Sequence, residues 1–229
     1  MTDYLSLTES KKMNIEQARF NMIEQQIRPW DVLDADILDL LLVVKRENFV
    51  PEATRNLAFV DTFIPLPGGE HMLTPKLEAR IAQDAQIKKH ENVLLVGAGT
   101  GYLAALLAHR ARHVTAVEIS PEMKALAEKN LADNGIANVT VELGNGAQGW
   151  SNGAPFDVIV FSGSLPVLPE AVLQQVKVGG RIVAIIGDSP VMSAHRITRT
   201  GEHGYDTVKL FETDVKPLEL AVKPSSFTF

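Results

Sequence analysis

Three glycines at alternating positions follow an apolar run near the middle of the chain. The run Val93–Val96 ends at Gly97, and Gly99 and Gly101 follow before an Ala/Leu-rich segment begins. This order predicts a buried strand, a tight turn and the start of a helix. Glycine lets the backbone adopt a positive φ and approach a ligand closely, and a helix N-terminus offers free N–H groups. The turn is therefore suited to binding a nucleotide-like ligand.

A carboxylate lies where such a ligand would carry its ribose. Glu118 ends the next apolar run, about 20 residues after the glycines, a spacing at which ribose hydroxyls are held. Dinucleotide-binding turns have the spacing G-x-G-x-x-G, but here Tyr102 occupies the position of the third glycine. The spacing G-x-G-x-G is commoner in S-adenosylmethionine (SAM) methyltransferases. A purely structural strand–helix turn is the alternative interpretation.

Strands and helices alternate from Val93 onward, which predicts a doubly wound α/β fold with a mostly parallel sheet. We expect about seven strands in this Rossmann-like sheet, because each helical segment is flanked by apolar runs. Residues 194–212 read as two strands around a glycine-containing turn, so the sheet should end in a C-terminal antiparallel hairpin. The glycine turn and Glu118 then share the edge where open α/β sheets bind ligands.

The N-terminal part of the chain has a different pattern. Residues 15–27 and 37–44 are predicted to form helices, and a Pro/Gly-rich loop follows at residues 61–72. We expect residues 1–75 to form an N-terminal helical module with a substrate-side loop. Residues 76–229 should form the ligand-binding core, packed with the module as a single domain.

The composition excludes several classes of protein. The formal net charge of −6 argues against a broad nucleic-acid surface. The sequence contains no cysteine, and its six histidines show no metal-ligand spacing, so we expect no metal site. No apolar stretch is long enough to cross a bilayer, and the N-terminus does not resemble a signal peptide. We therefore expect a cytoplasmic protein with neither a nucleic-acid nor a membrane partner.

Several further segments have the pattern of one known family: Asn48–Glu52, Leu57–Asp61, Gly97–Tyr102, Glu118–Ile119, Gly144–Gly146, Gly149–Trp150, Pro155–Asp157 and Gln174–Arg181. On these segments, the chain resembles the protein-L-isoaspartate O-methyltransferase family over residues 15–218. The resemblance implies a class I SAM methyltransferase fold, SAM as the cofactor, and methylation of an isoaspartyl carboxylate as a protein-repair reaction. The implied partner is an isoaspartyl-containing protein or peptide, or a small carboxylate substrate.

The same resemblance implies the cofactor contacts. The amide oxygen of Asn145 could accept a hydrogen bond from the adenine amino group. Tyr102 would pack either near the methionine end of the cofactor or in the core. Ser162, after the fourth predicted strand, would contact the cofactor or the substrate, or belong to a plain turn. The predicted cofactor-binding residues are Gly97, Ala98, Gly99, Gly101, Tyr102, Glu118, Ile119, Asn145, Gly146 and Ser162.

Three positions depart from the pattern of the family. Leu73 stands where the family carries its active-site serine, Leu95 where it usually has an acidic residue, and Asn145 where it usually has Asp. His71 and Thr74 are the polar groups near the lost serine, so they are the candidate substrate contacts. Thr74 could equally be a helix cap, and His71 could be an ordinary loop residue. The catalytic residue therefore stays unknown from the sequence.

The expected reaction makes few demands on catalytic side chains. A carboxylate acceptor is already ionised at neutral pH, so it needs alignment and desolvation and no general base. The absence of a Ser/His/Asp set argues against a hydrolase and not against this reaction. Three hypotheses stay open: an isoaspartyl methyltransferase, a relative with a different acceptor because of Leu73, and a non-catalytic SAM-binding or interaction protein.

Overall fold

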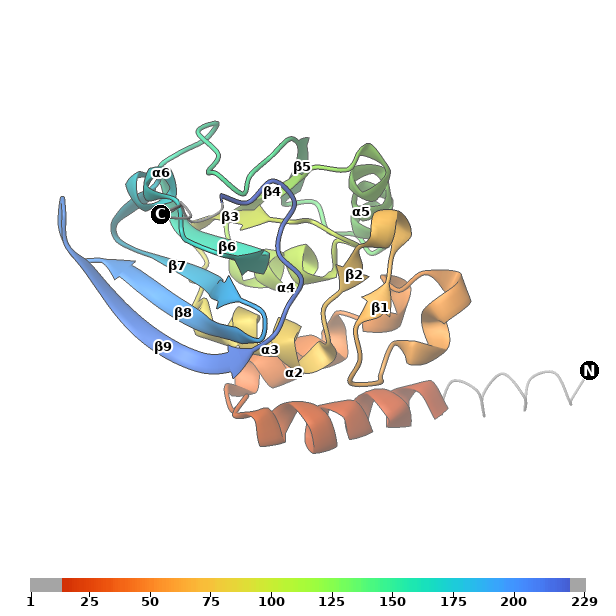
Figure 1. The fold of residues 1–229 in the computed structure, drawn as a ribbon. Coiled ribbons are helices and arrows are strands. Elements are labelled where there is room, and N and C mark those ends of the chain that lie inside the picture. The colour runs from red at the N-terminus through yellow and green to blue at the C-terminus, as the bar shows by residue number, and fades with distance from the viewer. Residues whose placement is uncertain (1–13, 223–229) are drawn as a thin grey trace, which may run out of the picture.

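The computed structural model describes residues 14–222 and is built around a seven-stranded β-sheet (Figure 1). The strands are β3 (Asn92–Val96), β4 (His113–Glu118), β5 (Val139–Leu143), β6 (Phe156–Leu165), β7 (Val176–Asp188), β8 (Val191–Arg199) and β9 (Tyr205–Thr213). Their order is β5-β4-β3-β6-β7-β8-β9. The strands from β5 to β7 pair in parallel, whereas β8 is antiparallel to both β7 and β9. The predicted mostly parallel sheet and its C-terminal hairpin are confirmed.

Two strands are longer than the sequence predicts. β6 was expected to end at Phe161, but it continues through Ser162 to Leu165 after a shift in its pairing with β7. Two adjacent glycines usually indicate a turn, but Gly179 and Gly180 lie inside β7, next to another register shift. A bulge accommodates extra residues without ending a strand, which is why these glycine-containing segments remain in the sheet.

Helices cover one face of the sheet more fully than the other. The core cluster that contains Val93 and Leu95 of β3 also contains apolar side chains of four helices. Leu94 and Val96 point to the opposite face, where they share a second cluster with Val172 of the short helix α6 (Glu170–Gln174). The four helices are α2 (Ala35–Val43), α3 (Pro75–Asp84), α4 (Tyr102–Arg110) and α5 (Pro121–Asp133).

The N-terminal segment begins as predicted and then changes its helical form. Residues 14–22 are α-helical, and the predicted helix continues as a π-helical turn, η1 (Ile23–Ile27), and a 3₁₀ turn, η2 (Arg28–Trp30). Asp34 caps α2, because its carboxylate accepts hydrogen bonds from the N–H groups of Asp36 and Ile37. Asp is a favoured residue at this position, so α2 begins where its residue types allow.

The Pro/Gly-rich segment is more ordered than a loop. Its ends pair as β1 (Ile64–Pro65) and β2 (His71–Met72) around the 3₁₀ turn η5 (Pro67–Gly69), after the 3₁₀ turns η3 (Arg46–Asn48) and η4 (Glu52–Leu57). Ile64 and Met72 are buried, so the hairpin is anchored on the core. It holds the turn between its strands beside the sheet edge that carries the glycine turn.

One buried cluster runs through the N-terminal segment and the sheet region. It includes Met22 and Phe49 on one side and Leu107 and Val160 on the other. The division of the chain at residue 75 stays a prediction. Within residues 14–222, no helix has the length and apolar character that a membrane span requires.

Candidate functional site

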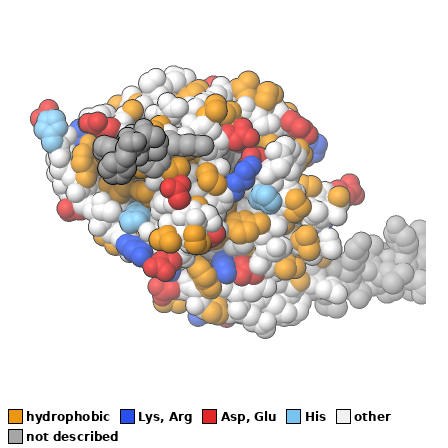
Figure 2. All heavy atoms as spheres, viewed as in Figure 1, with side chains coloured by type: hydrophobic (Ala, Val, Ile, Leu, Met, Phe, Trp, Pro, Cys, Tyr) orange, Lys and Arg blue, Asp and Glu red, His pale blue; other side chains and the backbone are white. Residues whose placement is uncertain are grey.

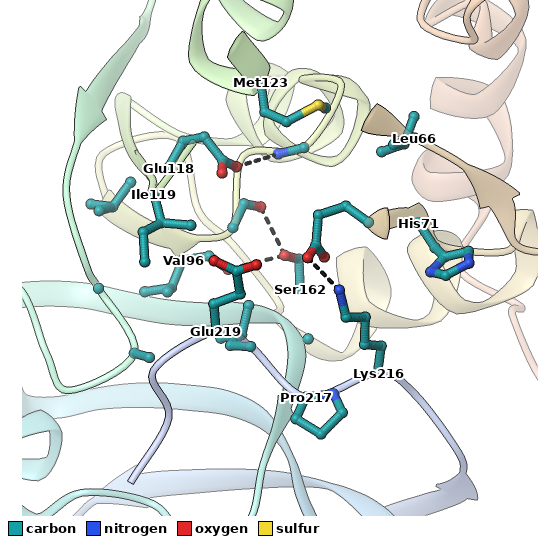
Figure 3. A pocket seen from close by; sticks show the side chains of 18 of the residues that line it. Leu66, His71, Val96, Glu118, Ile119, Met123, Ser162, Lys216, Pro217 and Glu219 are labelled. Atoms are coloured by element: carbon teal, nitrogen blue, oxygen red, sulfur yellow. Dashed lines mark hydrogen bonds and ion pairs between the residues drawn. The ribbon is translucent and has the colours of Figure 1, made fainter. Parts of the chain in front are cut away.

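A pocket of about 280 Å³ opens at the carboxyl ends of β3, β4 and β6 (Figure 3). Glu118, Ile119 and Met123 lie on one side of it, and Leu66, His71 and Lys216 lie on the other. Of the predicted site residues, those that line the pocket are His71, Leu73, Gly97, Gly99, Glu118, Ile119, Asn145, Gly146 and Ser162. The structure thus brings most of them together from five separate segments of the chain.

The glycine turn has the backbone conformation that its residue types predict. Gly97, Gly99 and Gly101 have φ values of +88°, +54° and +87°, in the left-handed region where side chains cause strain. A Cβ on Gly97 would lie 2.1 Å from the Ser162 hydroxyl, so any side chain there would displace this hydroxyl as well as strain the backbone. Gly97 and Gly99 line the pocket, whereas Gly101 lies behind it, where α4 packs against Ala127 of α5.

Glu118 ends β4 beside this turn and is almost fully buried. One carboxylate oxygen accepts a hydrogen bond from the Gly99 N–H at 3.0 Å, and the other accepts one from the Ser120 N–H at 3.0 Å. These bonds fix the carboxylate at the pocket wall. Each carboxylate oxygen can accept a second hydrogen bond, so Glu118 keeps the capacity to hold the hydroxyls of a bound ribose.

The neighbouring loop supplies a second polar wall. The Oδ1 atom of Asn145 accepts a hydrogen bond from the Ala147 N–H at 2.9 Å, which orients the amide group. A Cβ on Gly146 would lie 2.9 Å from a methyl group of Val96, so this loop packs closely against β3. The amide oxygen has one further lone pair, which is the acceptor that a bound adenine would need.

Ser162 lies inside β6 and not in a turn. Its hydroxyl lies 3.0 Å from the Val96 carbonyl and 2.8 Å from the Gly97 carbonyl, to which it donates. The side chain therefore ties β6 to the start of the glycine turn. It also lines the pocket, so it defines the floor between the two sides.

Ala98, Gly101, Tyr102 and Thr74 do not line the pocket. The Tyr102 ring is 1% exposed and packs against Phe49 at a centroid distance of 5.5 Å. Burial raises the pKa of its hydroxyl, and that hydroxyl has no hydrogen-bond partner among the described residues. Of the two interpretations of Tyr102, the core aromatic is therefore the one that the structure shows.

Thr74 stands at the N-cap position of α3 but does not cap the helix with its side chain. Its carbonyl accepts the first helical hydrogen bonds, while its hydroxyl is buried and has no partner within the described part of the chain. Pro75 fills the first helical position, where no N–H needs a partner. The prediction of a capping hydroxyl is wrong, although the helix begins where the sequence placed it.

Leu73 lines the pocket where the sequence comparison with the family placed a serine. Its carbonyl oxygen accepts a hydrogen bond from Arg46 Nη2 at 2.6 Å. Arg46 also donates to the Ala58 carbonyl at 2.7 Å and to the Glu78 carboxylate at 3.0 Å, and it is 1% exposed. This buried guanidinium therefore holds the pocket wall from behind. Sequence reasoning missed Arg46, because its partners lie far away along the chain.

Glu78, the partner of Arg46, is an unusual carboxylate. Burial raises its pKa from 4.5 to about 7, although the nearby Arg46 guanidinium opposes the shift. Between pH 4.5 and about 7, the folded protein therefore keeps a proton on Glu78 that the unfolded chain has released. This group thus favours folding at low pH. Its contribution is lost as the pH rises through about 7.

We expect the free energy of unfolding to show this loss as a dependence on Glu78. Between about pH 5 and about pH 8, the free energy of unfolding of the wild type, taken relative to that of a Glu78→Gln variant, should fall by on the order of 2 kcal/mol. Urea unfolding at several pH values measures it. A difference that stays constant over this range would show that Glu78 keeps its ordinary pKa.

A segment that the sequence did not single out closes the pocket. Residues 214–219, which we call the C-terminal strap, follow β9, and Val215–Glu219 line the pocket. The buried Ser164 holds the strap: its hydroxyl donates to the Val215 carbonyl at 2.7 Å, and its N–H donates to the Lys216 carbonyl at 3.1 Å. No local motif marks these residues, so only the folded arrangement identifies them. The other lining residues that were missed are Phe63, Leu66, Glu70, Val96, Val117, Met123, Gly144, Ala147 and Gly163.

The surface around the site carries mixed charges. On the face shown in Figure 2, Lys and Arg side chains are scattered among Asp and Glu side chains. Among the described residues, no group of three or more His, Asp or Glu side chains could hold a metal ion. The candidate site is a mostly apolar pocket with one fixed carboxylate, that of Glu118, and it is suited to an organic ligand.

Comparison with known proteins identifies one family along most of the chain. The family model described as protein-L-isoaspartate(D-aspartate) O-methyltransferase matches residues 17–213. A protein-L-isoaspartate O-methyltransferase from Rhodopseudomonas palustris is 36% identical over 86% of this chain and 91% of its own length. One from Protochlamydia amoebophila is 38% identical over 73% of this chain and 80% of its own length.

Solved structures share the fold. A protein-L-isoaspartate O-methyltransferase superposes with a TM-score of 0.76 at 24% identity, covering 90% of this chain and 67% of that chain. A beta-aspartate methyltransferase from Plasmodium falciparum, in complex with S-adenosyl-L-homocysteine, gives 0.73 at 19% identity, covering 87% of this chain and 97% of that chain. The fold is that of the class I SAM-dependent methyltransferases, as the resemblance to the family implied. With the family match and these relatives, the chain belongs to the protein-L-isoaspartate(D-aspartate) O-methyltransferase family.

Proposed function

We propose that this protein transfers a methyl group from SAM to the carboxylate of an isoaspartyl residue in a protein or peptide. One observation carries the proposal. In a chain of this family, Gly97, Gly99 and Glu118 converge on one pocket at the carboxyl ends of the strands. Ligands of open α/β sheets bind in that position.

The residues present fit the cofactor. Glu118 is fixed by two backbone N–H groups and can accept hydrogen bonds from the ribose. Asn145 offers an oriented amide oxygen to the adenine, and Gly97 and Gly99 leave the turn free of side chains. When bound, SAM supplies the electrophilic methyl group, which the side chains of the protein do not provide.

The other side of the pocket fits an acceptor. Phe63, Leu66, Leu73 and Val215 make this side apolar, so an entering carboxylate loses most of its water. Desolvation and alignment are what an ionised acceptor needs, and neither requires a general base. In this proposal the module of residues 1–75 supplies most of the acceptor side, and the C-terminal strap adds Val215 to it. The rest of residues 76–229 supplies the cofactor side. The expected cytoplasmic location stays a prediction.

Two measurements test the proposal directly. Calorimetric titration with SAM and S-adenosylhomocysteine should show binding, whereas NAD should not compete. A methyl-transfer assay should show labelling of an isoaspartyl peptide above the level of its aspartyl control. A protein that binds SAM but labels neither peptide would instead be a SAM-binding relative without this activity.

Leu73 favours a second candidate, methylation of a different carboxylate. A hydroxyl at this position could donate a hydrogen bond to the acceptor carboxylate, and a leucine cannot. If this second candidate holds, the wild type transfers poorly to isoaspartyl peptides, and a Leu73→Ser variant shows an increase in kcat/KM. The increase should be on the order of tenfold, the lower end of what a hydrogen bond to a charged group contributes.

The control for this variant is Leu66→Ser. Leu66 is a leucine of the same pocket and is 7% exposed, close to the 6% of Leu73. Both substitutions remove a similar amount of buried apolar surface, so only the effect of the hydroxyl at the proposed acceptor position should differ. Robust wild-type activity that Leu73→Ser lowers would show that another group binds the acceptor.

A further inference from the structure

The acceptor side of the pocket contains a single strong cation. Among the described residues that line the pocket, Lys216 of the C-terminal strap is the only lysine or arginine. Its ammonium group pairs with the Glu70 carboxylate and lies 3.1 Å from the Gly69 carbonyl, across the pocket mouth (Figure 3). The cation thus spans from the strap to the hairpin of β1 and β2.

The backbone of Lys216 is fixed while its side chain remains accessible. The Lys216 carbonyl accepts a hydrogen bond from the Ser164 N–H, and Ser164 also accepts one from the Leu218 N–H at 2.9 Å. The side chain of Lys216 is 41% exposed and that of Glu70 is 34% exposed. An exposed ion pair contributes little to stability, so a competing carboxylate could replace Glu70 at small cost.

We propose that Lys216 binds the acceptor carboxylate. In the absence of an acceptor, Glu70 pairs with the Lys216 ammonium group, and the acceptor carboxylate then replaces it. This inference rests on the proposed function and names the residue that recognises the acceptor. A carboxylate entering an apolar pocket needs a partner that offsets its lost hydration. The Leu73 side chain offers no hydrogen bond, and Arg46 is buried behind the wall, where each of its three nitrogens already donates to a protein oxygen. Lys216 is left as the group with the required charge.

If the acceptor carboxylate replaces Glu70 on Lys216, substitutions of these two residues should change the affinity for the acceptor in different directions. Lys216→Met removes the cation and keeps the length of the side chain, whereas Glu70→Gln removes the competing carboxylate and leaves the cation free. Both variants lose the same ion pair. If the pair only fastened the strap to the hairpin, both variants would weaken acceptor binding alike.

The experiment is calorimetric binding of an isoaspartyl peptide to the protein loaded with S-adenosylhomocysteine. We expect the dissociation constant to rise at least tenfold in Lys216→Met, to recover in Lys216→Arg, and to stay equal or fall in Glu70→Gln. A peptide that carries an amide in place of the isoaspartyl carboxylate is the control. Its affinity should be the same for the wild type and Lys216→Met.

Equal affinities of the wild type and Lys216→Met for the isoaspartyl peptide would overturn the inference. The same holds if the peptide binds to neither protein. An equal loss in Lys216→Met and Glu70→Gln would overturn it as well. The proposed function fails on a different result, namely no methyl transfer by the wild type. Where transfer occurs, KM for the peptide should rise in Lys216→Met with a smaller change in kcat.

Discussion

A Glu118→Ala variant is expected to bind SAM and S-adenosylhomocysteine about 5- to 150-fold more weakly than the wild type, a loss of about 1–3 kcal/mol. The substitution removes the carboxylate that would accept hydrogen bonds from the ribose. It also leaves the N–H groups of Gly99 and Ser120 without their acceptor, so the turn loses its fixed geometry. Both effects act on the same side of the pocket.

Isothermal titration calorimetry with S-adenosylhomocysteine measures this loss without requiring turnover. Glu118→Gln should lose less than Glu118→Ala, because its amide oxygen still accepts one hydrogen bond. Glu122→Ala is the matched control: Glu122 is an exposed carboxylate in the first turn of α5 and does not line the pocket. Equal affinities for the wild type and Glu118→Ala would show that Glu118 does not hold the cofactor.

The parts of the site that the sequence predicted are those with a local backbone signal. Gly97, Gly99 and Glu118 lie in two short runs, and a strand followed by glycines has few alternative structures. The parallel sheet follows from the same alternation. The positions of Gly97, Gly99 and Glu118 on the pocket wall could therefore be predicted from sequence before any packing was known.

The rest of the site depends on contacts between distant residues. Arg46 and Leu73 are 27 residues apart, Ser164 and Val215 are 51 apart, and Lys216 and Glu70 are 146 apart. A residue type alone does not reveal such partners, because many charged and polar side chains could make equivalent bonds. For the same reason, the sequence left Tyr102 and Thr74 with two interpretations each.

Because Arg46 is buried and paired, its removal should strongly destabilise the fold. Arg46→Met leaves the Glu78 carboxylate buried without its cation and frees the carbonyls of Ala58 and Leu73. Breaking a buried ion pair by removing one partner costs about 3–5 kcal/mol, a large share of a typical domain's stability of about 5–15 kcal/mol. We expect the free energy of unfolding to fall by that amount.

The loss should also depend on pH in a way that identifies its cause. Without Arg46, the pKa of Glu78 rises further, so the variant should lose more stability at about pH 8 than at about pH 6, where Glu78 binds a proton.

Replacing both residues, in Arg46→Met/Glu78→Leu, should restore part of the stability, because no charge is then left unpaired. Arg55→Met, at an exposed arginine of η4, is the matched control and should change the free energy of unfolding by less than about 0.5 kcal/mol. Urea unfolding at both pH values measures all four proteins, and a loss in Arg46→Met that is independent of pH would mean that its cause is lost packing and not the stranded carboxylate.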